Sequence, residues 1–308
     1  MNNASAPAPE DLRVFDEVAR RSSFIAAAQA LGASPAYVSK RIKLLEQQLG
    51  TQLLHRSTRR VALTEDGERV HRWALRILDD FEQLRQALGG TPQQAVGHLR
   101  VVSSFGFGRR QVAPALAALS RAQPQLQLRL ELYDRLVDVA GEGHDLDLRV
   151  GDEIAPQLIA RRLARNHRVL CAAPSWVAAH GRPATPQALQ ALDCLVIKER
   201  DHPVGLWRLQ QGARAWTVKV AGPLSSNHGE VALQWALDGH GIVLRSLWEV
   251  APLLADGRLV QLLPDCIQPA DIWAVYPTRL ERSAKLRVAV DFLADWFAAR
   301  GADQGRWD

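Results

Sequence analysis

Residues 23–50 run SFIAAAQALGASPAYVSKRIKLLEQQLG, and this stretch predicts two helices joined by a tight turn. Ser23 precedes the first helix as a typical N-cap, and Gly32 can adopt the left-handed conformation that ends it. Ser34 and Pro35 are typical of the N-cap and the first position of a second helix. The alanines of the first helix are small, so a neighbouring helix can approach it closely. The stretch therefore predicts a helix-turn-helix.

The second helix of this pair has one apolar face and one polar face. Its apolar residues recur at helical spacing and predict a buried stripe of Val38, Ile42, Leu45 and Leu49. The opposite face carries short and cationic side chains, which can contact base edges and phosphates in a DNA groove. On this helix we predict DNA contacts from Ser34, Pro35, Ala36, Tyr37, Ser39, Lys40 and Arg41.

The next segment, residues 53–63, predicts a basic hairpin. Its sequence LLHRSTRRVAL gives two short strands around a tip that holds Arg56, Arg59 and Arg60. Six cations against one acid give residues 34–63 a local net charge of +5, which equals the formal net charge of the whole chain. Counterion release from DNA requires such a concentration of positive charge. We add Arg56 and Arg59 to the predicted DNA contacts.

A solvated basic face on an ordinary helical pair is the alternative explanation of these charges. The conjunction of two caps, an apolar stripe, a turn glycine and a basic hairpin favours DNA binding over that alternative.

The order of small, apolar and charged residues from Ala27 to Gly67 resembles the winged helix-turn-helix of LysR-type transcriptional regulators. The matching positions are Ala27, Ala28, Leu31, Ser34, Val38, Ser39, Ile42, Leu45, Glu46, Leu49, Gly50, Leu53, Leu54, Arg56, Arg59, Leu63, Thr64 and Gly67. At position 54 that family usually has phenylalanine, so Leu54 is a packing change. Tyr37 stands where a small residue is common, and we expect it to alter base preference.

A long amphipathic helix is predicted after the hairpin. Thr64 can cap it, and apolar residues then recur at alternating steps of four and three. They form a heptad seam of Val70, Ala74, Ile77, Phe81, Leu84 and Leu88. Such a seam needs a partner helix from a second copy, although a helix that lies on its own domain is the alternative. In the resembling family this helix pairs two subunits, so we expect a homodimer, with further pairing into a homotetramer.

Length and composition indicate a soluble protein of two or three domains. With 308 residues, of which 47% are hydrophobic, the chain can fill sizeable cores. We find no apolar run long enough to span a bilayer, and residues 1–10 lack the basic and apolar regions of an export signal. We therefore expect a cytoplasmic protein with no membrane partner.

The three cysteines and nine histidines predict neither a disulfide framework nor a metal site. Cys171, Cys194 and Cys266 are odd in number and scattered, and the histidines form no ligand pair at helical spacing. Some LysR-type proteins sense oxidants by pairing two cysteines, so Cys171 and Cys194 stay open as an alternative sensor. Both lie in apolar, strand-like runs, where a buried thiol is an inert hydrophobe.

From about residue 97 the pattern changes to alternating strands and helices, which indicates an α/β fold. Strands are expected over 99–103, 126–132 and 146–150. Helices are expected over 109–122, after Thr185, from Ser226 or Asn227 to Gly239, and over 283–299.

The resemblance to the LysR type implies that this α/β region is a two-lobed effector domain, like periplasmic solute-binding proteins. We expect a winged helix-turn-helix over 1–67, a linker helix over 68–90 and the effector domain over 91–308. Its first lobe would cover about 97–168 and 269–308, and its second lobe about 169–268. Within the family the chain resembles the subgroup that activates D-malate and tartrate utilisation. The stretches that carry this likeness are 103–109, 146–154, 194–201, 224–227, 234–239 and 242–246.

Several polar residues follow the predicted strands of this region. In open α/β sheets ligands collect at the carboxyl ends of strands, where helix N-termini favour anions. Cations from both lobes could clamp a doubly charged acid, because arginine binds carboxylates through two hydrogen bonds. We predict effector contacts from Ser103, Ser104, Phe105, Arg149, Lys198, Arg200, Ser226, Asn227 and Arg245. Arg149 could equally pair with Asp147 or Asp152 in a structural ion network.

Three function classes were compared. A sequence-specific transcription regulator explains the basic hairpin, the heptad helix and the two-lobed region together. A solute-binding transport protein explains only the last of these. An enzyme would need a nucleophile, base or metal constellation, and we find no Gly-x-Ser-x-Gly, phosphate loop or Cys-x-x-Cys. We therefore expect a regulator without catalytic residues, metal or cofactor, whose partners are promoter DNA, a dicarboxylate effector, a second copy and RNA polymerase.

Overall fold

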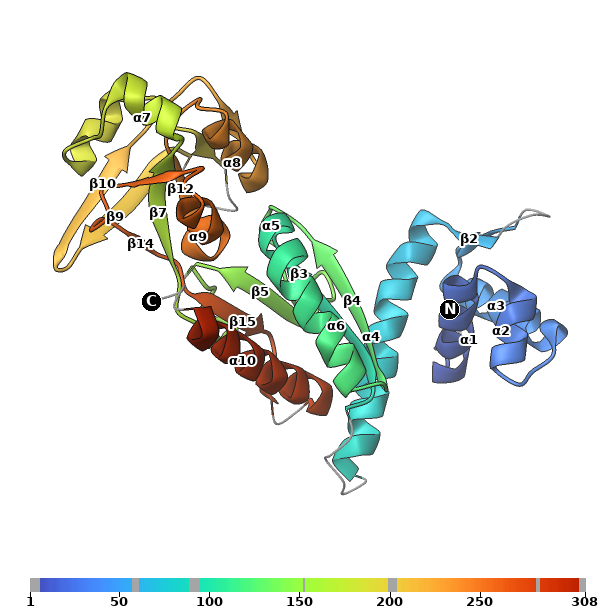
Figure 1. Ribbon diagram of the computed structural model, residues 1–308. Coiled ribbons are helices and arrows are strands. Elements are labelled where there is room, and N and C mark those ends of the chain that lie inside the picture. The colour runs from blue at the N-terminus through green and yellow to red at the C-terminus, as the bar shows by residue number, and fades with distance from the viewer. Residues whose placement is uncertain are drawn as a thin grey trace. The chain divides into compact units, whose positions relative to one another are not determined.

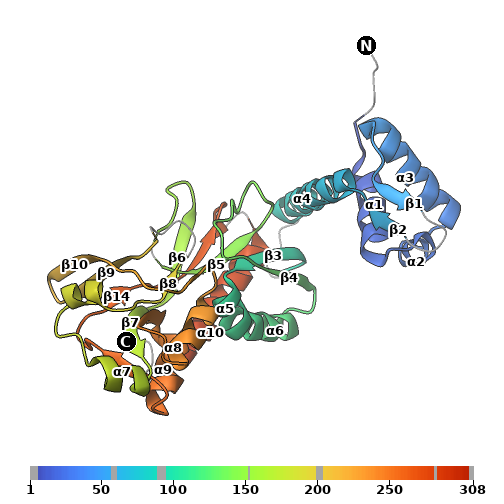
Figure 2. The ribbon, with the colours of Figure 1, turned by 90° about the horizontal axis from the view of Figure 1, so that it is seen from above.

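The computed structural model describes residues 6–56, 61–88, 95–151, 153–198, 204–280 and 283–304 (Figures 1 and 2). The chain divides into two units, Met1–His98 and Leu99–Asp308. None of the described helices combines the length with the apolar character that a bilayer crossing requires.

The first unit contains a helix-turn-helix, a hairpin and a long helix. Its elements are α1 (Pro9–Arg21), α2 (Phe24–Ala30), α3 (Pro35–Leu49), β1 (Leu54–Arg56), β2 (Val61–Leu63) and α4 (Glu65–Leu88). Both predicted caps are confirmed, because Ser23 Oγ accepts a hydrogen bond from Ala26 N at 3.3 Å and Ser34 Oγ accepts one from Tyr37 N at 3.1 Å. Gly32 follows α2 with a φ of 61°, as the turn requires.

The core of this unit lies between α1, α2, α3 and α4. Val38, Ile42 and Leu45 are fully buried in it, which confirms three positions of the predicted stripe. The prediction is wrong for the fourth position, because 38% of Leu49 is exposed. Leu49 is in the last turn of α3, next to the C-cap Gly50, and this places it at the edge of the core.

The first lobe of the second unit is built on a five-stranded sheet. Its strand order is β4 (Leu126–Leu132), β3 (Gly97–Ser103), β5 (Leu146–Val150), β15 (Ile272–Tyr276) and β6 (Ile159–Ala164). Strands β3 and β5 are parallel, whereas β15 runs antiparallel to β5 and β6. The helical segments beside this sheet are α5 (Phe105–Phe107), a π-helix (Gly108–Val112), α6 (Ala113–Ala122) and α10 (Ala284–Gln304) (Figure 1).

The second lobe is centred on β7 (His167–Ala172). This strand pairs antiparallel with β12 (Val243–Ser246), β13 (Val260–Leu262) and β14 (Gln268–Pro269). The same lobe contains a hairpin of β9 (Leu206–Gln211) and β10 (Arg214–Lys219), and a parallel pair of β8 (Val196–Ile197) and β11 (Ser225–Ser226). Its helices are α7 (Pro174–His180), a 3-10 helix (Pro186–Ala191), α8 (Gly229–Leu237) and α9 (Leu247–Ala255).

The chain passes between the two lobes twice, at Asn166 and at Ala270-Asp271. Asn166 N donates a hydrogen bond to Asp271 Oδ1 at 3.0 Å, and Asn166 Nδ2 donates to the carbonyl oxygen of Ala270 at 2.7 Å. Ala270 N returns a bond to the carbonyl oxygen of Asn166 at 3.0 Å. The crossing segments are therefore bonded side by side, and the expected two-lobed α/β fold is confirmed.

Some predicted element boundaries are wrong. The helix expected from residue 109 begins at Phe105 and includes a π-helical turn. The helix expected to open at Ser226 or Asn227 begins at Gly229, because Ser226 pairs with Ile197 in a strand instead of capping a helix. The segment after Thr185 is a 3-10 helix.

Candidate nucleic-acid interface and interlobe cleft

The N-terminal turn of α3 presents the side chains that the sequence assigned to DNA. Ser34, Pro35, Ala36 and Tyr37 are exposed, and 40% of Tyr37 is accessible. Further along the helix, Lys40 is exposed and Ser39 is half-buried. This surface is polar and cationic, and the predicted contacts of these residues with base edges and phosphates stay predictions.

Arg41 is a correction to that predicted surface. Its Nε lies 2.7 Å from Oδ1 of Asp11 on α1, and the Asp11 side chain is only 1% exposed. A buried carboxylate needs a paired cation, so Arg41 serves the contact between α1 and α3 instead of extending to a phosphate.

The hairpin pairs as expected, with Leu54 opposite Leu63 and Arg56 opposite Val61. Arg56 lies at the end of β1. The predicted contact from Arg59, and the position of the Arg56 side chain, lie outside the described residues.

The heptad seam of α4 divides into two parts. Ala74 is 1% exposed and Val70 packs against the same core, so these two positions belong to their own unit and not to a free dimerisation surface. Ala74 is buried and Val70 is half-buried because α4 packs along α1, where His71 Nε2 lies 2.8 Å from Asp16 Oδ1. The expectation that all six positions face a second copy is therefore wrong for Val70 and Ala74.

The rest of the seam leaves large apolar side chains in contact with solvent. Ile77, Phe81 and Leu84 are 37%, 46% and 55% exposed. Trp73, which the heptad pattern missed, is 57% exposed. The side chain of Leu88 lies outside the described residues. We define Trp73, Ile77, Phe81 and Leu84 as the α4 patch.

Two cavities lie along the cleft between the lobes of the second unit. The larger, of about 380 Å³, is lined mainly by the second lobe, including Trp207, Arg208 and Thr217. The smaller, of about 60 Å³, lies between Ser104 of the first lobe and Arg245 of the second. Arg168, at the start of β7, lines both cavities.

The predicted residues that follow β3 take different positions. Ser103 is a correction, because it is fully buried and its Oγ donates to the carbonyl oxygen of Leu148 at 2.6 Å. Ser104 lines the smaller cavity, and its predicted effector contact stays a prediction. Phe105 is 42% exposed, and its ring lies 5.3 Å from the ring of His228, which belongs to the second lobe.

Arg149 is a second correction. It is 5% exposed, and its Nε and Nη2 lie 2.9 and 2.5 Å from Asp147 Oδ2. Its Nη1 donates to the carbonyl oxygen of Glu153 at 3.0 Å. The structural ion network that the sequence left open is the arrangement found, and it holds the guanidinium within the first lobe.

Arg245 lines the smaller cavity but is already paired. Its Nε and Nη2 lie 2.6 and 2.5 Å from Oε2 of Glu249, one turn later. It also packs on the start of α8, since a Cβ added to Gly229 would fall 2.1 Å from Arg245 Nη1. Glycine at 229 therefore allows this cation to approach the backbone closely.

The remaining predicted residues lie around β8 and β11. Lys198 is exposed, and its backbone N–H donates to the carbonyl oxygen of Ser226 at 2.8 Å. Ser226 Oγ accepts a hydrogen bond from His228 N at 3.0 Å, and Asn227 is exposed. Arg200 lies outside the described residues.

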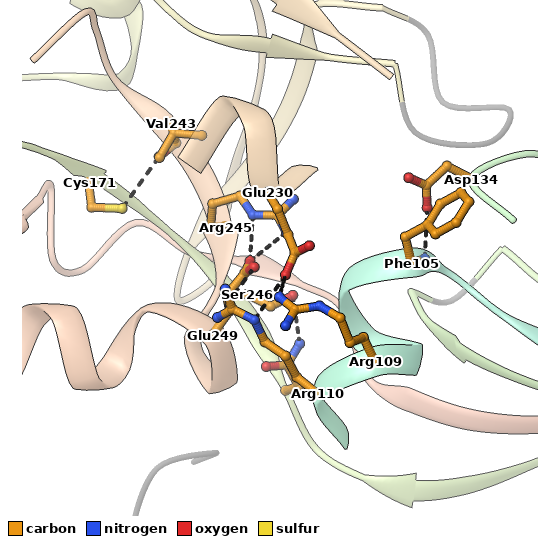
Figure 3. A network of polar contacts seen from close by, with 11 residues as sticks. Phe105, Arg109, Arg110, Asp134, Cys171, Glu230, Val243, Arg245, Ser246 and Glu249 are labelled. Carbon is orange, nitrogen blue, oxygen red and sulfur yellow. Dashed lines mark hydrogen bonds and ion pairs between the residues drawn. The ribbon is translucent and has the colours of Figure 1, made fainter. Parts of the chain in front are cut away.

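Sequence reasoning missed a charged network at the mouth of the smaller cavity (Figure 3). Glu230 Oε1 accepts hydrogen bonds from Arg109 Nη2 and from Arg110 Nε, the latter at 3.0 Å. Burial acts to raise the pKa of Glu230, but both arginines outweigh it and the pKa lies below its usual value. Two arginines near the start of a helix are unfavourable to the helix dipole, and this was the available signal of a carboxylate partner.

Cys171 and Cys194 lie in the cores of the second lobe, and Cys266 is buried in the same lobe. Burial raises the pKa of Cys171 to about 12 and that of Cys194 to about 12, and it also raises the pKa of Cys266. All three thiols are free. Because the thiolate is the reactive form, this environment opposes the alternative in which cysteines sense an oxidant. Within the described ranges, no three histidine, cysteine or acidic side chains gather as metal ligands.

Comparison with known proteins finds a matching family for each of the two units. Residues 9–68 match the family described as bacterial regulatory helix-turn-helix protein, lysR family, and residues 92–298 match the LysR substrate binding domain. Two relatives from Escherichia coli (strain K12) are similar along nearly their whole length. The HTH-type transcriptional regulator DmlR is 58% identical, covering 97% of this chain and 96% of that protein. The HTH-type transcriptional activator TtdR is 49% identical, covering 96% of each chain.

A solved structure shows the same architecture. CrgA, a LysR-type transcriptional regulator from Neisseria meningitidis, aligns with a TM-score of 0.57 and 29% identity over 94% of this chain and 98% of that chain. With both units matched by family and with relatives alike from end to end, the chain belongs to the LysR family of bacterial transcriptional regulators.

Proposed function

We propose that this regulator binds promoter DNA through the first turns of α3 and the basic hairpin, and that a small hydroxy-dicarboxylate such as D-malate or tartrate switches it. The exposed positions Ser34 to Tyr37 and Lys40 support the first part. The sequence resemblance to activators of D-malate and tartrate utilisation, and the names of the relatives DmlR and TtdR, support the second.

The position of Arg168 carries the effector proposal. This cation lines both interlobe cavities, and each cavity has a second arginine, Arg208 in the larger and Arg245 in the smaller. A four-carbon diacid has two carboxylates a few bonds apart, which matches cations in neighbouring cavities. The larger cavity, at about 380 Å³, is within the range of small-ligand sites.

The proposal includes the assembly. The α4 patch is a row of apolar side chains on a helix that a second copy would cover, giving a homodimer. Pairing of dimers into a homotetramer and contact with RNA polymerase are further parts of the proposal. The proposal also places the protein in the cytoplasm, where the DNA is, and gives it a binding role instead of a catalytic one.

Calorimetry on the full chain tests the effector class. We expect D-malate and tartrate to bind, succinate to bind more weakly because it lacks the hydroxyl group, and benzoate not to bind. Arg168→Gln should weaken D-malate binding by about tenfold or more, since a charge-assisted bond contributes about 1.5–3 kcal/mol. Arg258→Gln is the matched control, because Arg258 is exposed and pairs with Asp256. Binding of an aromatic acid or a nucleotide, with no dicarboxylate bound, would reject the class.

A further inference from the structure

The cleft already holds a carboxylate that the chain itself supplies. Glu230 lies in the first turn of α8 in the second lobe, and Arg109 and Arg110 lie in the π-helix of the first lobe. Both guanidinium groups bond the same oxygen, Oε1 of Glu230 (Figure 3). Glu230 also lines the smaller cavity. Two arginines of the first lobe therefore bind a carboxylate of the second lobe at the edge of the proposed effector site.

A second carboxylate lies behind this group. Glu249 is 2% exposed, and its Oε1 receives no hydrogen bond from the described residues. Arg110 Nη1 lies 3.9 Å from that oxygen. Arg110 thus has a second acidic neighbour besides Glu230, although Glu249 also pairs with Arg245 through Oε2.

We propose that Arg109 and Arg110 form the subsite for one carboxylate of the effector, and that Glu230 occupies this subsite until the effector displaces it. This inference rests on the proposed function. The Arg109 and Glu230 side chains are 61% and 22% exposed. Because ion pairs in contact with water contribute little net stability, a ligand carboxylate can replace Glu230 at small cost.

Displacement links ligand binding to the arrangement of the lobes. The bonds from Glu230 to the two arginines join the lobes on this side of the cleft, and Arg208 Nη1 joins Glu153 Oε1 at 2.9 Å on another. A carboxylate on Arg109 and Arg110 removes only the first of these ties. A ligand shifts a conformational equilibrium by its differential affinity for the two states, and here the competition with Glu230 supplies that difference.

The test measures D-malate and tartrate binding by calorimetry on the full chain and on four variants. Glu230→Gln keeps the shape of the side chain and removes its charge, and we expect the Kd to fall by about fivefold, the size of a modest ion-pair energy. Asp291→Asn removes one carboxylate charge from an exposed pair with Arg161 within the first lobe, and it should leave the Kd unchanged. Arg109→Gln should raise the Kd by about tenfold, whereas Arg121→Gln, on an exposed position of α6, should not. Circular dichroism melts confirm that each variant is folded.

The outcomes separate the two ideas. Binding to the wild type with an equal or higher Kd for Glu230→Gln overturns the displaced-carboxylate inference and leaves the proposed function standing. An equal gain in Asp291→Asn also overturns it, because the gain would then come from the change in net charge. Binding to Glu230→Gln alone supports the subsite but contradicts the effector assignment for the wild type. Binding to neither protein overturns both.

Discussion

Arg41 and Asp11 form an ion pair between α3, the helix predicted to bind DNA, and α1. The two side chains differ in burial. The Asp11 side chain is 1% exposed and the Arg41 side chain 24% exposed. An unpaired buried carboxylate cannot reach water, whereas a partly exposed arginine can extend toward it. The two partners therefore contribute differently, although they share one contact.

We expect Arg41→Gln to lower the free energy of unfolding by about 3–5 kcal/mol, because it leaves Asp11 buried without its cation. Asp11→Asn should cost only about 1–2 kcal/mol, as Arg41 then turns to solvent. Urea unfolding measures both. Lys40→Gln is the control, and it should leave stability unchanged while lowering the salt slope of DNA binding by about one unit. Equal costs for the first two variants would contradict the asymmetry.

One buried and one half-buried histidine, His144 and His167, predict a pH dependence of stability. Burial lowers the pKa of His144 more than the facing carboxylates Glu131, Glu142 and Asp145 raise it, and Arg100 adds to the lowering. Burial also lowers the pKa of His167.

Both histidines have a usual pKa of 6.5, so the unfolded chain binds protons there more readily than the folded chain does. Stability from these groups is present above pH 6.5 and is lost as the pH falls through that value toward the folded pKa. We expect the urea midpoint of the wild type to fall between pH 7 and pH 5.5. His144→Gln and His167→Gln together should flatten this loss, and an unchanged slope would show that other groups cause it.

At the scale of elements, α4 serves two roles along one stripe. Its N-terminal part packs on α1 and completes the core of the first unit through Ala74. Its later part exposes the α4 patch. The first part of the heptad pattern is therefore buried within its own unit, and the later part is exposed to solvent. A charged substitution should have a different effect in each part.

Phe81→Asp should dissociate the proposed dimer without unfolding the unit, because Phe81 is 46% exposed. Ala74→Asp should instead lower the melting temperature, because it buries a charge without a partner. Sedimentation equilibrium and thermal melts measure the two effects. Arg72→Asp, an exposed position of the same helix outside the seam, is the control. An unchanged oligomer for Phe81→Asp would remove the role proposed for the patch.

For the whole molecule, the double crossing between the lobes borders the cleft, because Ala270 lines the larger cavity. Asn166 is 3% exposed and bonds the returning segment at Ala270 and Asp271. Arg168 follows two residues later and lines both cavities. The proposed ligand contact of Arg168 and the crossing therefore share one short stretch of chain.

We expect Asn166→Ala to destabilise the unit by about 1–3 kcal/mol, since it leaves the Ala270 carbonyl without its donor. Effector affinity should fall with it, while the salt dependence of DNA binding stays the same. Urea unfolding, calorimetry and a promoter-binding titration measure these quantities. Asn227→Ala, on an exposed residue, is the matched control. Loss of DNA binding with effector affinity preserved would contradict this assignment.

Local patterns in the sequence were enough to predict the helix-turn-helix, its caps, the hairpin and the α/β character of the rest. These depend on local patterns, since Ser34 caps α3 and Val38, Ile42 and Leu45 recur on one face whatever lies far along the chain. The family resemblance also followed from such spacing.

Which charges have partners inside the protein became visible from the packing of distant parts of the chain. Arg41 meets Asp11, Arg149 meets Asp147, and Arg109 meets Glu230, a residue 121 positions away. Ser103, which follows the expected pattern of a strand end, is buried against Leu148. The physical reason is that burial and long-range pairing depend on which surfaces the fold brings together, and a cation has the same local sequence signature whether its partner is a ligand or the protein itself.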